Sequence, residues 1–248
     1  MRFHRTAALL AVAVLVAACT GGTASSPNPS AHSYASSSTA PNSAAAALPS
    51  TGASAPSGSS AASAGAPDLS SCPTSQPPAM AASDAKLVTL KTSKGTIVIK
   101  VEGALSPIAA GNFVALAQCG YYTGVVFHRL VPGFVIQGGD GTFGREPNLN
   151  MTNIGTGGPA YTIQDEPVTS AYTRGAVAMA KTPAPNSANS QFFIVLANIS
   201  LSPTYQIFGH VTSGMDVVDA IAAMPNSGGD ANTAVNPVAM DSVTVSNP

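Results

Sequence analysis

The sequence contains little charge and no tryptophan. Its 248 residues include 10 Lys or Arg and 11 Asp or Glu, which gives 8% charged residues and a formal net charge of −1. A chain without a basic excess lacks the electrostatic footprint of a nucleic-acid-binding protein, so we expect no nucleic-acid partner. Its length is sufficient for one sizeable domain with additional segments.

The sequence also lacks the usual signatures of metal sites and hydrolases. Its four histidines, at positions 4, 32, 128 and 210, show no spacing typical of metal ligands. No serine stands in a nucleophile-elbow motif. We interpret His128 as a buried, hydrogen-bonded residue, and Asp165 and Glu166 as flanking a solvated turn. We therefore expect no metal, no cofactor and no hydrolytic chemistry.

Residues 1–18 have the pattern of a secretory signal. Arg2 and Arg5 precede an apolar run of 12 residues that ends at Ala18, shorter than the about 20 residues that a spanning helix needs. The ending Leu-Val-Ala-Ala-Cys, with Cys19 last, resembles the lipobox of bacterial lipoproteins. This resemblance implies export, cleavage before Cys19 and lipid anchoring to the outer face of the bacterial cell membrane. The alternative is an ordinary signal peptide in which Cys19 has no role.

Residues 19–82 form a segment rich in Ala, Ser and Pro, and residues 20–67 contain no Asp, Glu, Lys or Arg. Such a segment buries too little apolar surface to offset the entropy lost on ordering, so it is predicted to be a disordered tether. A flexible chain as long as residues 20–67 has an end-to-end distance of about 40 Å. The folded domain is predicted to span residues 83–248, which is long enough for one core.

Many short strands and two helices are predicted in the folded domain. Apolar alternation and turn residues favour strands at 86–92, 96–101, 125–130, 133–138, 161–163, 175–180, 190–196, 205–211 and 238–245. Ser106 and Pro107 are typical of a helix start, with Gly120 as its end, and a second helix is predicted at 214–224. This pattern favours a mainly β protein, an antiparallel barrel with a helix at each end.

The stretch from Phe127 to Asp140 carries an arginine in an otherwise apolar setting. On a strand, Arg129 and Gln137 share one face with Val131 and Val135. An arginine among apolar residues is unusual in so poorly charged a protein. From this stretch alone, a paired or snorkelling arginine at a barrel rim and a functional arginine are equally open.

Several motifs of the domain, in order and at suitable spacing, strongly resemble the cyclophilin family of peptidyl-prolyl cis-trans isomerases. They are Phe127-His128-Arg129, Pro132-Gly133-Phe134, Gln137-Gly138-Gly139-Asp140, Met179-Ala180, Asn189-Ser190-Gln191-Phe192-Phe193 and Phe208-Gly209. The resemblance implies a closed eight-stranded antiparallel barrel capped by two helices, with the active site on one outer face. It assigns catalysis to Arg129, Phe134 and Gln137, with Gln137 holding the arginine. It assigns substrate binding to Val135, Ala180, Lys181, Gln191, Phe193, Leu201 and Tyr205.

The chain departs from the usual cyclophilin pattern at several positions. Lys181 stands where the family has Asn, and Tyr205 where many members have His. Ser200 replaces the tryptophan that contacts cyclosporin, so we expect weaker binding of that drug. Cys72 and Cys119 remain if Cys19 is lipidated. An exported protein permits a disulfide between them, although two separate thiols remain the alternative.

Two functions follow from the resemblance. The first is an isomerase that accelerates rotation about X-Pro bonds in exported proteins and assists their folding. The second is a catalytically idle proline-binding chaperone or adaptor at the cell envelope. Both take proline-containing polypeptides as partners, and we expect a monomer. The Arg129, Phe134 and Gln137 set favours the isomerase, because a charged donor can stabilise the twisted transition state.

Overall fold

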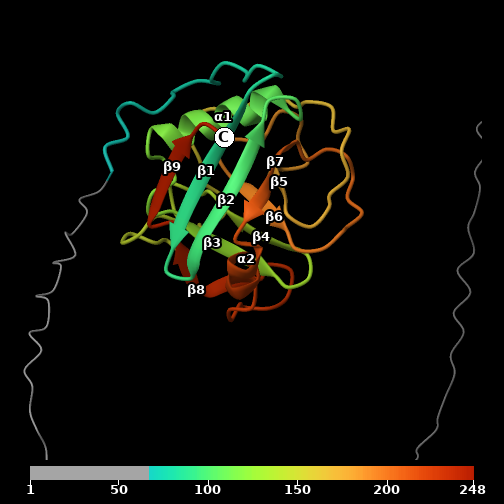
Figure 1. Cartoon of the computed structure of the whole chain (residues 1–248). Helices are drawn as coiled ribbons and strands as arrows, with labels where there is room; N and C mark the ends of the chain where they lie inside the picture. Colours follow the sequence, from blue (N-terminus) through green and yellow to red (C-terminus); the bar gives the residue numbers. More distant parts are fainter. Residues whose placement is uncertain (1–66) are drawn as a thin grey trace, which may run out of the picture. The chain divides into compact units, whose positions relative to one another are not determined.

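The computed structural model describes residues 67–248 (Figure 1). The predicted signal sequence, Cys19 and most of the predicted tether lie outside these residues. The strands are β1 (Ala85–Thr92), β2 (Gly95–Glu102), β3 (Val126–Val131), β4 (Val135–Gly138), β5 (Ala176–Met179), β6 (Phe192–Val195), β7 (Ile207–Ser213), β8 (Thr233–Ala239) and β9 (Ser242–Ser246). The helices are α1 (Pro107–Gln118) and α2 (Met215–Ala222). No helix within 67–248 is long and apolar enough to cross a membrane.

All nine strands belong to one antiparallel sheet, in the order β8-β3-β4-β6-β5-β7-β2-β1-β9. The prediction of a mainly β, antiparallel fold with two helices is therefore confirmed. Figure 1 shows the sheet curled, with α1 at one end and α2 at the other. Apolar residues alternate along the strands, so that Ile97, Ile99 and Val101 of β2 are fully buried.

The prediction of a closed eight-stranded barrel was wrong in detail, because the last predicted strand is divided. Within residues 67–248, the two edge strands β8 and β9 pair with β3 and β1 and not with each other. The chain changes partner at two residues: Met240 N–H donates to Val125 O (2.9 Å), and Asp241 N–H donates to Lys91 O (2.7 Å). The predicted strand at 161–163 is also absent, leaving only a single bridge between Ile163 and Ala188.

The main core lies between the concave face of the sheet and the two helices. Phe113 of α1 is its centre, with ring centroids 5.1 Å from Tyr122, 5.1 Å from Phe192 and 4.7 Å from Phe208. Because strand side chains alternate, the neighbouring Phe193 points to the other face, where it joins a second apolar cluster. This second cluster provides the apolar part of the functional site.

Residues 72–82 pack against the domain, although they were assigned to the tether. Met80 N–H donates to Pro107 O at 2.9 Å, and Met80 packs against the main core. A Cβ on Gly111 of α1 would lie 2.2 Å from Pro78 O, so only glycine allows this close approach. A disulfide also joins Cys72 to Cys119 at the end of α1. Contacts with the domain therefore include residues that precede the predicted boundary at residue 83.

The first turn of α1 is capped by a side chain distant in sequence. Ser106 precedes the helix as predicted, but its side chain makes no capping hydrogen bond. Instead, the Glu166 carboxylate accepts hydrogen bonds from Ile108 N–H (2.8 Å) and Ala109 N–H (2.9 Å). Gln206 Nε2 also donates to this carboxylate at 3.0 Å. Glu166 is thus a helix cap, and its assignment to a solvated turn was wrong.

Replacing Glu166 with Ala should lower the free energy of unfolding by about 1–2 kcal/mol, the usual cost of losing a helix cap with a favourable charge. Denaturant titration followed by circular dichroism would measure the change. Glu146→Ala is the matched control, because Glu146 is exposed and its carboxylate makes no hydrogen bond within residues 67–248. Equal stability of the two variants would contradict the assignment of Glu166 as a cap.

Candidate active site

Arg129 is placed on the outer face of the sheet by an irregularity in β3. The register of β3 shifts between Phe127 and Arg129 against both β4 and β8, and against β4 this shift leaves His128 as the extra residue. Arg129 pairs with Gln137 of β4. Within residues 67–248, no hydrogen bond or ion pair engages the Arg129 guanidinium. Its donors are therefore available to a ligand.

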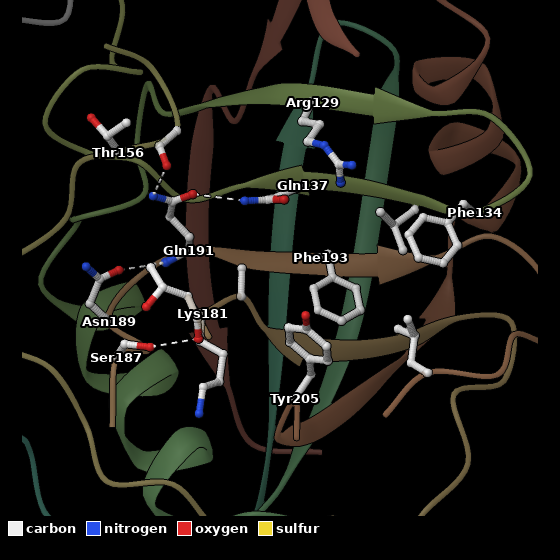
Figure 2. Close-up of a pocket in the computed structure, with 15 residues that line it drawn as sticks. Arg129, Phe134, Gln137, Thr156, Lys181, Ser187, Asn189, Gln191, Phe193 and Tyr205 are labelled. Carbon is white, nitrogen blue, oxygen red and sulfur yellow. Dashed lines mark hydrogen bonds between the residues drawn. The ribbon is translucent and has the colours of Figure 1, made fainter. Parts of the chain in front are cut away.

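An apolar pocket lies beside Arg129 (Figure 2). Phe193 of β6 forms its floor and is only 5% exposed. The Tyr205 ring packs edge-on against Phe193, with centroids 5.7 Å apart and an interplanar angle of 80°. Tyr205 is held in turn, because Tyr172 Oη donates to Tyr205 O at 2.9 Å. Phe134 and Leu201 border the same pocket.

The other end of the site is polar and built on two glutamines. Gln137 Nε2 donates to Gln191 Oε1 at 3.0 Å, so Gln137 is held by Gln191 and not by a hydrogen bond to Arg129, contrary to our expectation. Gln191 Nε2 donates to Gly155 O and Gly157 O, both at 2.9 Å. Figure 2 shows Gln137 lying between Gln191 and Arg129. The two side chains thus connect the sheet to the glycine-rich loop of residues 141–158.

The glycine-rich loop is held in place by a buried carboxylate. Asp140 is fully buried and accepts backbone N–H bonds from Thr142 (3.0 Å), Phe143 (2.9 Å), Gly155 (2.7 Å) and Gly157 (3.0 Å). Four such bonds satisfy the buried charge. The N–H groups of Gly155 and Gly157 in this loop are therefore directed at a protein carboxylate.

His128 is buried beneath this loop, with its ring against Gly155. Its residue exposure is 4%, and neither ring nitrogen has a hydrogen-bond partner within residues 67–248. The prediction of a buried histidine is confirmed, but the prediction that it is hydrogen-bonded was wrong. Burial lowers the pKa of His128 to about 4, with Asp140 opposing this shift and Arg129 adding to it. The ring is neutral at pH 7.

The pocket and its polar extension form one cavity of about 400 Å³, within the range of small-ligand sites. All ten residues that the resemblance assigned to catalysis or substrate binding line it. Five further lining residues lie in loops and were not predicted from the sequence: Gly155, Thr156, Thr182, Ser187 and Asn189. Among the lining residues only Arg129 and Lys181 are charged. Lys181 is paired with Asp165, so Arg129 is the unpaired charge of the cavity.

The sequence of most of the domain matches a known family. The sequence model of the family described as "Cyclophilin type peptidyl-prolyl cis-trans isomerase/CLD" matches residues 87–245. The chain belongs to the cyclophilin family. It is therefore a cyclophilin-type peptidyl-prolyl cis-trans isomerase. The fifteen-residue cavity on the outer face of the sheet is its candidate active site.

Curated relatives and solved structures of this family resemble the chain closely. A peptidyl-prolyl cis-trans isomerase of Acinetobacter baylyi is 41% identical over 168 residues, covering 64% of this chain and 85% of the relative. One from Streptomyces antibioticus is 37% identical and covers 64% of this chain and 97% of the relative. A crystal structure of a Cryptosporidium parvum cyclophilin, described as in the presence of the dipeptide Ala-Pro, is 27% identical, with a TM-score of 0.56 and coverages of 65% and 99%.

Proposed function

We propose that this isomerase acts on X-Pro bonds of exported polypeptides at the bacterial cell envelope, and that Arg129 is its catalytic residue. The observation that carries the catalytic assignment is the unpaired Arg129 guanidinium beside the Phe134 and Phe193 pocket. The relative with Ala-Pro supports a proline-containing peptide as the ligand. The proline ring would occupy the apolar pocket, and the flanking residues would lie along the polar end.

The chemistry requires no nucleophile and no proton transfer. Rotation about an X-Pro bond must break amide resonance, and the barrier for peptide bonds is about 18–20 kcal/mol. At the twisted midpoint the prolyl nitrogen becomes pyramidal and gains a lone pair. A fixed cationic donor near that nitrogen stabilises the twisted state more than either planar state, which lowers the barrier. Arginine suits this role because it stays protonated and its guanidinium is rigid and planar.

Gln137 supplies the second directed group in this proposal. Its nitrogen is engaged by Gln191, so its oxygen is left to accept a hydrogen bond from the substrate or from Arg129. Gln191 is fixed by two carbonyls of the loop that Asp140 organises. The site is therefore preorganised on the sheet, and little ordering is left for the moment of reaction.

A proline-isomerisation assay on the purified chain separates this proposal from the idle binder. The assay follows cis-to-trans conversion of an Ala-Pro peptide, with the uncatalysed rate as background. We expect acceleration that rises linearly with protein concentration. Peptide binding without any acceleration would favour the idle proline-binding module and overturn the catalytic assignment.

We also propose that the chain is exported and lipid-anchored through Cys19. Support comes from the sequence of residues 1–19, in which small residues and Cys follow the apolar run directly. Two or more acyl chains give stable membrane attachment, whereas one gives reversible binding.

Replacing Cys19 with Ser should therefore move the protein from the membrane fraction to the soluble fraction of fractionated bacterial cells. The loss should be nearly complete, because the acyl chains on Cys19 are the proposed anchor. Ser26→Ala, within the same uncharged segment, is a matched control that should leave membrane attachment unchanged. A Cys19→Ser protein that stays with the membrane would contradict lipidation at this residue.

A further inference from the structure

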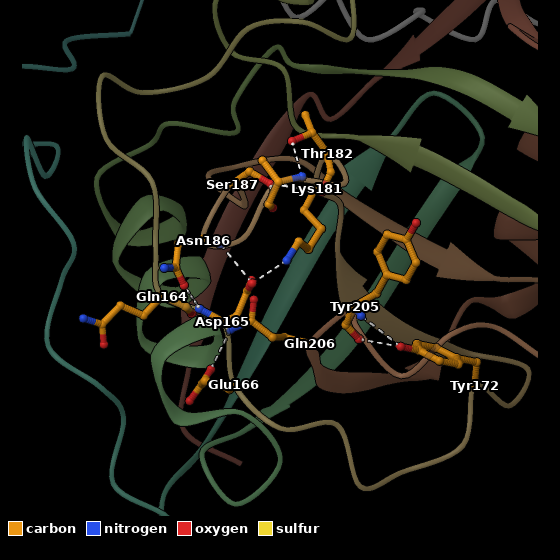
Figure 3. Close-up of polar contacts among 11 residues, drawn as sticks. Gln164, Asp165, Glu166, Tyr172, Lys181, Thr182, Asn186, Ser187, Tyr205 and Gln206 are labelled. Carbon is orange, nitrogen blue, oxygen red and sulfur yellow. Dashed lines mark hydrogen bonds and ion pairs between the residues drawn. The ribbon is translucent and has the colours of Figure 1, made fainter. Parts of the chain in front are cut away.

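We propose that Asp165 is a positioning residue for substrate binding: it fixes the loop of residues 181–189 and thereby sets the polar wall of the active site. The proposal rests on the function proposed above and adds a residue that does not itself line the cavity. Asp165 was predicted to flank a solvated turn. The structure instead places it against two residues of the loop (Figure 3).

The loop forms one wall of the active site without regular secondary structure to hold it. Lys181, Thr182, Ser187 and Asn189 all line the cavity. The loop's far end is anchored, because Asn112 Nδ2 of α1 donates to Asn189 O at 2.6 Å. Contacts inside the loop, such as Ser187 Oγ to Thr182 O at 3.1 Å, give it shape but do not attach it to the domain.

Asp165 supplies the attachment at the near end of the loop. Its Oδ2 accepts a charged hydrogen bond from Lys181 Nζ at 2.5 Å and another from Asn186 N–H at 2.9 Å. Its own N–H donates to Asn186 Oδ1 at 2.7 Å. Asn186 has φ +53°, a left-handed conformation that L-residues other than Asn and Asp seldom adopt. The reciprocal pair of bonds therefore holds the turn of the loop in an uncommon backbone conformation.

The ion pair between Asp165 and Lys181 should affect the loop because the Lys181 side chain is buried. The Lys181 side chain is only 8% exposed and the Asp165 side chain is 31% exposed. Burial raises the pKa of Asp165, but the bonds from Lys181 and Asn186 outweigh this and leave the pKa below its usual value. Asp165 itself is exposed, but the Lys181 side chain is buried, so removing Asp165 leaves a mostly buried lysine without its charge partner. Without Asp165, the ammonium group must move toward water and carry the start of the loop with it.

The catalytic groups are held by different elements. Arg129 lies on β3 and Gln137 on β4, where strand pairing fixes their backbones. The loop contributes only to the wall that contacts residues flanking the proline. Displacing it should therefore weaken substrate binding and leave the rotation step unchanged, which appears as a higher KM at nearly constant kcat.

The test compares Asp165→Asn with wild type in full-length protein, using the Ala-Pro peptide assay. Asparagine keeps the size of the side chain and an oxygen that can accept the hydrogen bond from Asn186 N–H. It removes the negative charge that holds the Lys181 ammonium. We expect KM to rise about fivefold or more, with kcat within twofold of wild type. In parallel, amide hydrogen exchange of residues 181–189 should become at least tenfold faster.

Two further variants separate a loop-positioning effect from general destabilisation. Asp219→Asn is the matched control, because Asp219 forms an exposed two-point pair with Arg174 (2.9 and 2.6 Å) and does not line the active site. It should leave KM unchanged. Lys181→Met removes the uncompensated ammonium, so hydrogen exchange of the loop should be no faster in the Asp165→Asn, Lys181→Met double variant than in Asp165→Asn alone.

Failure of the positioning role of Asp165 can be distinguished from failure of the proposed isomerase function. Wild-type protein without isomerase activity would overturn the function, and loop exchange would then still test the role of Asp165. An active wild type with unchanged KM and unchanged loop exchange in Asp165→Asn would overturn the positioning role. A fall in kcat at constant KM would also overturn it, because Asp165 would then affect the rotation step.

Discussion

Replacing Arg129 with Ala should lower kcat/KM for X-Pro isomerisation at least tenfold, while the fold is retained. Arg129 is the unpaired cation of the cavity, and the alanine variant would leave no donor on that strand position to face the prolyl nitrogen. A tenfold loss corresponds to about 1.4 kcal/mol of transition-state stabilisation. Because the Phe193 pocket is intact in this variant, the loss should appear in kcat more than in KM.

Two other arginine variants control this result. Arg129→Lys keeps the positive charge but loses the planar fork, so it should recover only part of the activity. Arg174→Ala removes an arginine from an exposed ion pair outside the active site and should leave kcat/KM unchanged. An Arg129→Ala protein with wild-type kcat/KM would exclude Arg129 as the catalytic residue, and attention would turn to Gln137.

The strands and the apolar part of the site were predictable because their signals are local. Alternation along Val135-Ile136-Gln137 already separates the core side chain from the two outward ones, and the structure places Ile136 in the main core and Val135 in the outer cluster. Phe192 and Phe193 alternate in the same way, with Phe192 in the main core and Phe193 in the outer cluster. Outward-facing neighbours on adjacent strands then form a common surface wherever those strands pair.

The features that escaped prediction all depend on contacts between distant segments. Glu166 caps a helix 58 residues earlier in the chain, and Asp165 binds Lys181 and Asn186 across two loops. No local pattern identifies such partners, because a carboxylate in a polar loop has the same sequence context whether it is solvated or buried against an amide. The division of the last strand is similar, since only the curl of the sheet requires the change of partner at Met240.

His128 also belongs to this group, and its burial predicts a pH-dependent stability. The pKa of His128 in the folded protein is about 4, against about 6.5 for an exposed histidine. Above pH 6.5 the ring is neutral in both states and contributes no pH dependence. As pH falls from about 6.5 to about 4, the unfolded chain binds a proton that the folded protein excludes, so stability decreases. The lowered pKa of His128 corresponds to about 3 kcal/mol of stability, most of which is lost by about pH 4.

Replacing His128 with Leu should remove this loss. Both ring nitrogens are buried without partners, so an apolar side chain of similar size should change stability at pH 7 by no more than about 1 kcal/mol. Urea titrations of both proteins at pH 7, 6, 5 and 4 measure the difference, and carboxylates that titrate in the same range cancel between them. The leucine variant should gain about 3 kcal/mol relative to wild type between pH 7 and pH 4. Parallel stability profiles would show that the folded protein accepts the proton on His128, which would require the glycine-rich loop over the ring to open without unfolding the sheet.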